Sequence, residues 1–332
     1  MSSATSAESR EAEFHRAAAA AWREWDESPA RLELVAHQEN VVFRAESERG
    51  ASFVLRLHRP GYHDLPELIS EQHWTAALNV AGVGAPVPVR ALDGRRYVEV
   101  PVGANESRLA GVSEWVDGEV LSDLVDEASG ELLAESFDAL GRIAARIHNQ
   151  AASWELPPHF TRHSFDVDGF LGEAPFWGRF WEASGLDESD RRLTSRAREH
   201  LRKLFVDFGQ DAENYSLIHG DLHPGNILKT KNGLRVIDFD DAGFGWHLYE
   251  LAVALFHYQS NPHFEMVRDA LVAGYRSERP LSDEALALLP AFLLMRALAI
   301  LGWIDARPEL GRRDAFDHVR GLVRRQAAAL LA

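Results

Sequence analysis

The segment at residues 217–241 constrains this chain most, because it sets polar residues at fixed spacings between three short apolar runs. The three runs are expected to be strands: residues 217–218, 227–228 and 234–237. A tight turn is predicted at residues 232–233, before the last strand. Asp221 and Asn226 lie in the loop between the first two strands, and Asp238 lies at the end of the last strand. These side chains can therefore converge on one point. Oxygen ligands suit a hard cation such as Mg2+, and a remaining carboxylate can accept a proton from a hydroxyl.

The residues HGDLHPGN, followed by IDFD, resemble the catalytic loop and metal-binding segment of the protein-kinase-like superfamily. The resemblance is to its aminoglycoside phosphotransferase and choline kinase branch in particular, which usually has HGD where protein kinases have HRD. It implies that Asp221 orients and deprotonates the acceptor hydroxyl, and that Asn226 and Asp238 hold the magnesium that bridges the ATP phosphates. The alternative interpretation, ordinary loop carboxylates and a histidine that caps a turn, leaves the combined spacing unexplained.

The composition narrows the class of protein. A chain of 332 residues, 46% hydrophobic and 26% charged, is long enough for about two globular domains. The absence of cysteine excludes disulfides, thiol catalysis and zinc-thiolate sites. No signal-peptide core and no run of about eighteen apolar residues is present, so we expect a cytoplasmic protein without a membrane partner. A net charge of −16 argues against a nucleic-acid partner, and fits either a cationic substrate or solubility alone.

The resemblance implies an α+β fold with two lobes. We expect an N-terminal tail and helix at 1–30, an ATP-covering lobe of antiparallel strands plus a helix at 31–116, and a mainly helical lobe at 117–332. Residues 1 to about 8 are predicted to be disordered. Hydrophobic periodicity predicts strands at 31–35, 40–45, 52–57 and 108–116, and helices at 8–25, 66–80, 132–150, 187–208, 247–258, 281–305 and 313–331.

The phosphate-binding strand departs from the protein-kinase pattern. The chain has three lysines, all in its second half, so none is available for this strand. Arg56 stands in that place, and its guanidinium can pair with the phosphates. Glu71 on the next helix is expected to orient Arg56, with Glu67 as the alternative. His58 and Arg59 are alternative phosphate ligands.

The resemblance implies that two further segments bind the nucleotide. No glycine-rich GxGxxG segment precedes the phosphate-binding strand, and a polar turn at 36–40, ending at Asn40, would cover the phosphates instead. Residues 113–118 resemble the hinge of the phosphotransferases. By that resemblance the carbonyl of Glu114 and the N–H of Val116 would hold the adenine.

The acceptor site is less well defined. Relatives contact the acceptor from the C-terminal region, which implies Trp303, Asp305 and Glu309 as candidates. Asp240 and Asp241 would add negative charge that suits an amine-bearing acceptor. Four aromatic residues at 176–181 could line a pocket or pack in the core.

Three residues around the catalytic loop have expected supporting roles. His219 is expected to hold the loop by hydrogen bonds, and His223 to be a partly exposed loop residue. Glu250 stands where relatives usually have an aspartate that braces the loop from below. Glutamate is one methylene longer, so this bracing stays open.

Together these features predict a Mg-ATP-dependent phosphotransferase that moves the γ-phosphoryl group to a hydroxyl of a small molecule, such as an amino alcohol or an aminoglycoside-like compound. One alternative is a stress-response-type protein Ser/Thr kinase of the same fold, although no activation segment is recognisable between Asp241 and the helix at 247. A second alternative is a nucleotide-binding pseudokinase, which the missing lysine favours and the intact set of Asp221, Asn226 and Asp238 opposes.

Overall fold

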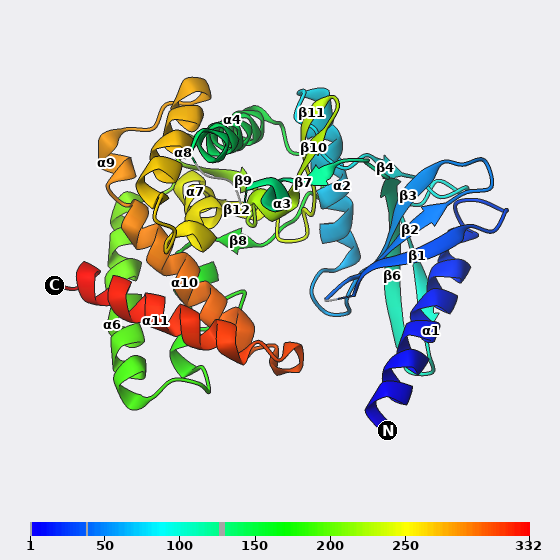
Figure 1. Ribbon diagram of the computed structural model, residues 1–332, viewed down its shortest axis with the longest axis horizontal. Helices are drawn as coiled ribbons and strands as arrows, with labels where there is room; N and C mark the ends of the chain where they lie inside the picture. Colours follow the sequence, from blue (N-terminus) through cyan, green and yellow to red (C-terminus); the bar gives the residue numbers. More distant parts are fainter. Residues whose placement is uncertain (1, 38, 126–129) are drawn as a thin grey trace. The chain divides into compact units, whose positions relative to one another are not determined.

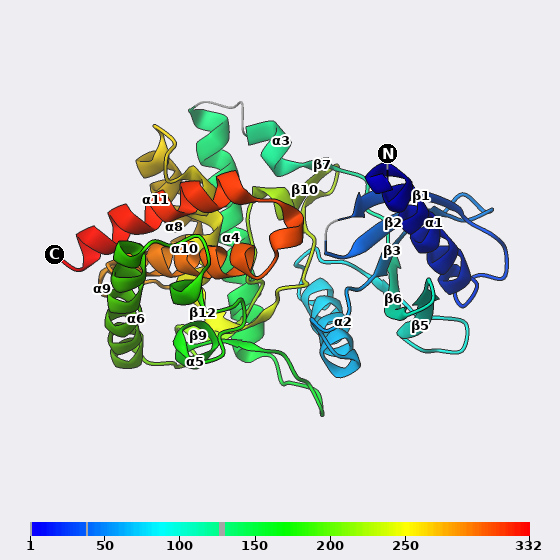
Figure 2. The same ribbon diagram turned by 90° about the horizontal axis from the view of Figure 1, so that it is seen from below.

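A computed structural model describes residues 2–37, 39–125 and 130–332 of the chain (Figures 1 and 2). It divides into two compact units. Unit 1 contains the described residues up to Gly118 together with Leu156–Thr161, and unit 2 contains the described residues of Glu119–Glu155 and Arg162–Ala332. The segment Leu156–Thr161 thus belongs to unit 1 although the chain has already entered unit 2.

Unit 1 is built on a six-stranded sheet in which every pair of strands is antiparallel. The strand order is β1-β2-β3-β6-β4, and β5 pairs with β6. The strands are β1 (Arg31–His37), β2 (Val41–Glu46), β3 (Ser52–Leu57), β4 (Pro88–Val89), β5 (Tyr97–Val102) and β6 (Glu106–Glu114). The helices are α1 (Ser2–Trp22) and α2 (Leu65–Val80). Helix α1 begins at Ser2. The sequence instead predicts a disordered tail there and a helix that begins at Glu8, so this prediction is wrong.

The two helices of unit 1 pack on opposite faces of the sheet. Successive side chains of a strand point to opposite faces. Leu55 and Leu57 of β3 are buried in the core that includes α1, so Arg56 lies on the other face. Tyr97 is in register with Arg56 through β6 and shares that face. Its hydroxyl donates to the carbonyl of Leu68 in α2 at 3.1 Å, so α2 covers the face that carries Arg56.

Unit 2 is mainly helical, and its helices pack closely where glycine permits. A Cβ on Gly141 of α4 would lie 2.1 Å from the carbonyl oxygen of Leu271, and one on Gly274 of α8 would lie 2.0 Å from that of Asp138. Helix α8, which is not among the helices expected from the sequence above, therefore lies directly against α4 (Figure 1). The helices are α3 (Leu121–Val125), α4 (Glu131–Ser153), α5 (Val167–Leu171), α6 (Glu188–Phe208), α7 (His247–Leu255), α8 (Phe264–Glu278), α9 (Asp283–Leu286), α10 (Leu289–Asp305) and α11 (Arg313–Leu330), with short 3-10 turns η1 (Phe180–Glu182), η2 (Pro224–Asn226), η3 (Phe256–Tyr258) and η4 (Pro308–Leu310).

Two small sheets of unit 2 bring the polar loops together. They have the orders β11-β10-β7 and β8-β12-β9. Pairing of Gly243 with Ile218 places the loop that precedes β12 beside the loop that follows β9. The turn between β10 and β11 is at 231–232, because Thr230 pairs with Gly233, so the predicted turn is shifted by one residue. The strands are β7 (Glu119–Val120), β8 (Ser164–Phe165), β9 (Tyr215–Ile218), β10 (Ile227–Thr230), β11 (Gly233–Val236) and β12 (Gly243–Trp246).

Among the described residues, the helical segment Asp283–Asp305 has the length and the apolar composition that a membrane span needs. Of its most apolar window, 67% is buried inside the protein. Helix α10, which forms most of this segment, packs against α7 and α11. It is therefore a core helix of unit 2.

Candidate active site

Glu250 on α7 holds the start of the catalytic loop. Its side chain is fully buried, and its two oxygens accept the backbone N–H groups of His219 at 2.6 Å and Gly220 at 2.9 Å. The longer side chain of glutamate thus braces the loop, a point that the sequence leaves open. Burial raises the pKa of Glu250, while the His219 ring and the two backbone hydrogen bonds act in the opposite direction.

His219 ties the catalytic loop to the segment that carries Asp238. Its Nδ1 accepts the backbone N–H of Asp221 at 3.3 Å, so Nε2 carries the hydrogen and donates to the carbonyl of Ile237 at 2.9 Å. The predicted structural role of this histidine is confirmed. Gly220 has φ of +80°, and a Cβ there would lie 2.5 Å from the carbonyl oxygen of Asp241. Only glycine satisfies both conditions without a shift of the backbone.

The carboxylate of Asp221 is held from three directions. Its Oδ1 accepts a hydrogen bond from Nη2 of Arg296, and its Oδ2 accepts one from Nδ2 of Asn226 at 3.2 Å. His223 lies 3.3 Å from Oδ2 through its Nε2. Nδ1 of His223 accepts the N–H of Gly225 at 3.0 Å, so in the neutral ring Nε2 carries the hydrogen and can donate to Asp221. His223 is therefore part of the site, beyond the minor role expected from the sequence.

These contacts determine the charge of Asp221. Burial acts to raise its pKa, but the charge of Arg296 and the contact with His223 outweigh burial and hold the pKa well below its ordinary range. The side chain is 26% exposed, so a substrate can reach it. Asp221 is therefore an ionised carboxylate that can accept a hydrogen bond from an incoming hydroxyl.

Asn226 and Asp238 lie together and have oxygen atoms suited to a cation. The backbone carbonyl of Asn226 accepts the N–H of Ile237 at 2.9 Å, which places Asn226 beside the residue that precedes Asp238. The side-chain nitrogen of Asn226 donates to the carbonyl of Asp221 at 2.9 Å, and this turns its Oδ1 away from Asp221. Asp238 has φ of +63°, a left-handed conformation that is strained for a residue with a side chain. An amide oxygen and a carboxylate are ligands that Mg2+ prefers, so these residues fit the ion.

Arg162 fixes the backbone that follows Asp238. It is buried, and its guanidinium donates to the carbonyls of Phe239 at 3.3 Å, Asp240 at 2.5 Å and Ala242. Three carbonyls on one guanidinium restrict the segment after Asp238 to one path. Sequence reasoning does not select Arg162, because nothing in its local pattern sets it apart from other arginines.

Arg296 is a second residue that sequence reasoning misses. It lies in the middle of α10 and is 5% exposed. Its Nη1 donates to the hydroxyl of Tyr249 at 3.3 Å, and its other terminal nitrogen reaches Asp221. The sequence does contain a signal: Arg296 is the one charged residue inside the apolar run at 289–304. A charge in a buried helix needs a partner, and here the partner is Asp221, the predicted catalytic carboxylate.

The predicted acceptor residues lie in different surroundings. Asp241 is half-buried, and its carbonyl oxygen lies 2.5 Å from the position of a Cβ on Gly220, so its backbone is next to the catalytic loop. Asp240 is buried, and its backbone is held by the Arg162 guanidinium.

The side chains of the two candidates from α10, Trp303 and Asp305, contact other residues of unit 2. Oδ1 of Asp305 accepts the N–H of Ser184 at 2.8 Å and its hydroxyl at 2.6 Å. The ring of Trp303 has the guanidinium carbons of Arg307 and Arg312 at 4.8 and 4.9 Å. The roles of Trp303 and Asp305 toward the acceptor stay predictions.

The aromatic run at 176–181 contributes mainly to the core. Trp177 is 4% exposed and Phe180 is 1% exposed. Phe176 stacks on His163 with ring centroids 3.8 Å apart. The packing interpretation therefore holds for Trp177 and Phe180, and the Trp177 ring also lies 5.3 Å from the guanidinium of Arg296.

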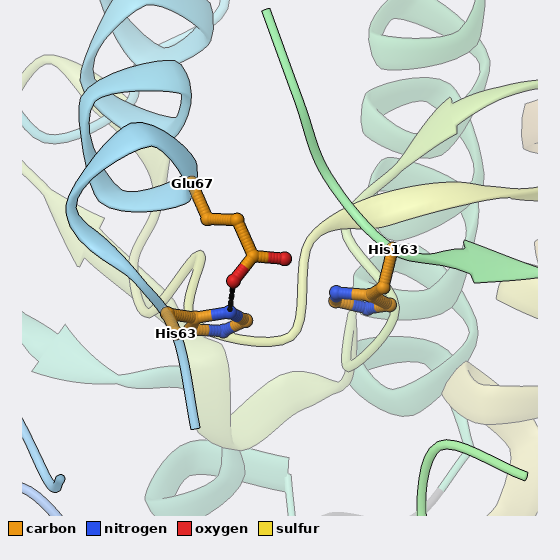
Figure 3. A group of neighbouring side chains, drawn as sticks. All are labelled: His63, Glu67 and His163. Atoms are coloured by element: carbon orange, nitrogen blue, oxygen red, sulfur yellow. Dashed lines mark hydrogen bonds and ion pairs between the residues drawn. The ribbon is translucent and has the colours of Figure 1, made fainter. Parts of the chain in front are cut away.

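In unit 1, Arg56 and Glu71 share one side of the sheet. Arg56 lies on the face of the sheet that α2 covers. Glu71 lies in α2, three residues after Leu68, whose carbonyl accepts the hydroxyl of Tyr97 from the sheet. The alternative residue, Glu67, instead forms the capping box of α2: its carboxylate accepts the N–H of Asp64 at 3.0 Å. The same carboxylate lies 3.3 Å from Nδ1 of His63 (Figure 3).

Part of the turn that is predicted to cover the phosphates links two strands of the sheet, β2 and β3. Oδ1 of Asn40 accepts the backbone N–H of Arg59 at 2.9 Å, and the side chain of Arg59 pairs with Glu39. These contacts connect the start of β2 to the end of β3. Gln38 lies outside the described residues.

The predicted adenine-binding hinge follows β6. The N–H of Glu114 donates to the carbonyl of Val87 at 2.9 Å, and that of Trp115 donates to Ser52 at 3.1 Å. These bonds fix the backbone just before Val116. The roles of Glu114 and Val116 toward adenine stay predictions.

Known proteins give an independent view of this site. The model of the phosphotransferase enzyme family matches residues 31–288. The chain belongs to this family. It is an ATP-dependent phosphotransferase that phosphorylates a hydroxyl of a small molecule, and its fold is the bilobal, kinase-like α+β fold that the catalytic motif predicts.

Individual relatives are kinases of small molecules. The chain is 33% identical to a solved microcompartment-associated aminopropanol kinase, with a TM-score of 0.81 and coverage of 96% of both chains. It is 25% identical to an amicoumacin kinase of Bacillus subtilis, over 83% of this chain and 80% of that protein. It is 27% identical to a homoserine kinase of Mesorhizobium japonicum, over 79% of this chain and 75% of the relative. These relatives favour the small-molecule interpretation over the protein-kinase alternative.

Proposed function

We propose that this enzyme transfers the γ-phosphoryl group of Mg-ATP to the hydroxyl of a small amino alcohol. The observation that carries the acceptor class is the similarity to an aminopropanol kinase along nearly the whole chain. Asp241 lies beside Gly220 of the catalytic loop, and its negative charge supports an acceptor with an ammonium group. We further propose that the enzyme works in the cytoplasm, where ATP is made.

Asp221 performs the acid-base part of the reaction. Its carboxylate accepts a hydrogen bond from the acceptor hydroxyl and directs the oxygen lone pair toward the γ-phosphorus. Because its pKa is held low, it is a weak base toward a neutral alcohol. The proton therefore moves to Asp221 as the new O–P bond forms and the bond to the departing ADP oxygen breaks, since this is when the hydroxyl becomes acidic. Positioning is then the larger part of its contribution.

Asn226 and Asp238 would hold Mg2+. When bound, the ion neutralises charge on the ATP phosphates. The chain's own part is to keep these two side chains in place, through the hydrogen bonds of Asn226 with Asp221 and through Arg162, which fixes the backbone after Asp238.

In unit 1, Arg56 would pair with the α- and β-phosphates in place of lysine, oriented by Glu71. The backbone of Glu114 and Val116 would hold adenine, and the turn at Asn40 would cover the phosphates. Each of these roles follows from the family resemblance and from the position of the residue in unit 1.

The test is ADP release by the purified protein with ATP and Mg2+, measured against aminopropanol, ethanolamine, choline, homoserine, aminoglycosides and a generic protein substrate. Asp221→Asn and Asp238→Asn are the controls. We expect stimulation by one or more amino alcohols, with rates at least about 100-fold lower in both variants. Stimulation only by aminoglycosides or by protein would refute the amino-alcohol proposal. Nucleotide binding without turnover on any acceptor would restore the pseudokinase alternative.

A further inference from the structure

Arg296 is a buried charge in a place where charge is costly. It lies on α10 among apolar neighbours and is 5% exposed. The rings of Trp177 and Phe256 are 5.3 and 6.0 Å from its guanidinium carbon. A guanidinium in such surroundings destabilises the fold unless it is paired. An aliphatic residue would suit a core helix better, so the arginine requires an explanation.

The explanation lies in the direction of its two terminal nitrogens. Nη2 donates to Oδ1 of Asp221, and Nη1 donates to the Tyr249 hydroxyl at 3.3 Å. Among the described residues, Nε of Arg296 is buried and has no hydrogen-bond partner. A residue that served only to anchor α10 would be expected to satisfy all its donors within the core. The paired nitrogens instead connect α10 and α7 to the catalytic carboxylate.

We propose that Arg296 is a positioning residue for Asp221. Its guanidinium fixes Oδ1, while Asn226 and His223 contact Oδ2, so the carboxylate is held in one orientation. A carboxylate with both oxygens held leaves only its remaining lone pairs for the acceptor hydroxyl, which restricts the line of attack. This inference rests on the proposed role of Asp221 and adds a residue that the catalytic motif does not contain.

A positioning role predicts a particular kinetic pattern. Removal of Arg296 should lower kcat, because the carboxylate loses its orientation, and should leave the acceptor KM and the nucleotide affinity nearly unchanged. Arg296→Met should lower kcat by about 100-fold, the scale of a small misplacement of a reacting group. Arg296→Lys keeps the charge without the planar fork, and its kcat should lie between those of the wild type and Arg296→Met.

The chain offers a matched control in the same unit. Arg324 on α11 donates from Nε to Oδ1 of Asp190 at 2.5 Å, and Asp190 is 3% exposed. Arg324→Met therefore also breaks an arginine pair with a buried aspartate. We expect it to lower the melting temperature and to keep the wild-type kcat. ADP binding, measured by calorimetry, shows that each variant is folded.

A second measurement needs no acceptor and so separates this inference from the proposed function. Melting temperatures of Arg296→Met, Asp221→Asn and the double variant form a cycle. If the pair is direct, the double variant should lose less than the sum of the single losses. Additive losses would overturn the pairing, even if an amino alcohol proves to be the acceptor. Coupled losses with no turnover on any amino alcohol would refute the proposed function alone.

Two kinetic outcomes would overturn the positioning role. If folded Arg296→Met keeps kcat within about threefold of the wild type, Arg296 only stabilises the fold, because a lost positioning contact costs far more. If the acceptor KM rises while kcat is unchanged, Arg296 binds the acceptor and does not act through Asp221.

Discussion

Oε2 of Glu250 accepts the backbone N–H of Gly220 at 2.9 Å, and Oε1 of the same carboxylate accepts that of His219 at 2.6 Å. A fully buried side chain of α7 thus satisfies two consecutive N–H groups at the start of the catalytic loop. The loop position therefore depends on a helix that begins well after the loop in sequence. The neighbouring Tyr249 contacts Arg296, so α7 supports Asp221 by two separate routes.

Replacement of Glu250 should be costly. Glu250→Ala is expected to lower the free energy of unfolding by about 2–5 kcal/mol, because it leaves two buried N–H groups without an acceptor and opens a cavity. Urea unfolding measures this change. The control is Glu265→Ala on α8, whose side chain is 71% exposed. It should change the free energy by less than about 0.5 kcal/mol, and equal effects of the two variants would contradict the bracing role.

Gly220 should tolerate no side chain. Gly220→Ala introduces a Cβ 2.5 Å from the carbonyl oxygen of Asp241 and 2.9 Å from the Phe165 ring, in addition to the strain of its positive φ. Gly209→Ala is the matched control: its φ is +72°, and nothing lies within 4 Å of the added Cβ. The control, whose ψ is −173°, should cost about 1–3 kcal/mol from its backbone conformation alone. Gly220→Ala should cost more and should also lower kcat, and equal costs would show that the contact with Asp241 is absent.

The loop that carries the predicted catalytic residues is recognisable from sequence because the proposed chemistry requires polar residues at fixed spacings. Asp221, Asn226 and Asp238 all lie in a stretch that two short strands fold back on itself. The residues that hold this stretch are not predictable in the same way. Arg296 is 75 residues from Asp221, and only the packing of α10 against α7 brings them together.

The secondary structure shows the same contrast between what the sequence predicts and what depends on tertiary contacts. Strands β1 to β3 and the long amphipathic helices are predictable because side-chain periodicity reports one buried face. The tight contact of helix α8 with α4 is not predictable, because it depends on Gly141 and Gly274, and glycine adds no hydrophobic signal. The exact role of Asp305 is also hidden in the sequence, since its bonds to Ser184 depend on a tertiary contact.

A buried histidine pair should make stability depend on pH. His148 and His247 stack with ring centroids 4.2 Å apart, and both are buried. Burial lowers the pKa of each well below 6.5, and the charge of Arg279 acts in the same direction. The folded state therefore binds fewer protons than the unfolded state below the unfolded value of about 6.5, so stability should fall as the pH decreases. Above that pH this contribution is complete.

The slope of this dependence can be measured. Each histidine should contribute up to about 1.4 kcal/mol per pH unit below pH 6.5. Glu250, whose pKa burial raises, acts in the opposite direction, so comparison of variants is more informative than the wild-type curve. Urea unfolding between pH 7.5 and 5 should show a shallower slope for His148→Gln than for the wild type. His318→Gln, an exposed histidine of α11, should keep the wild-type slope, and identical slopes for all three proteins would contradict the prediction.

Arg162 should control the affinity of the enzyme for the metal ion through the backbone. Its guanidinium holds the carbonyls of Phe239, Asp240 and Ala242, directly after Asp238. Asp238 has a strained φ of +63°, and such a conformation persists only when its surroundings enforce it. Arg162→Met should let this segment relax, so the Mg2+ concentration for half-maximal activity should rise by about 10- to 100-fold, the scale for loss of a residue that orients a ligand.

Arg198→Met is the control for Arg162→Met, because Arg198 also binds backbone carbonyls, those of Leu171 at 2.8 Å and Gly172 at 3.0 Å, outside the catalytic segments. It should reduce stability and leave the Mg2+ requirement as in the wild type. A Mg2+ titration of ADP release at saturating ATP measures both variants. Equal Mg2+ requirements in Arg162→Met and the wild type would mean that the conformation of Asp238 is set by its own hairpin and not by the arginine.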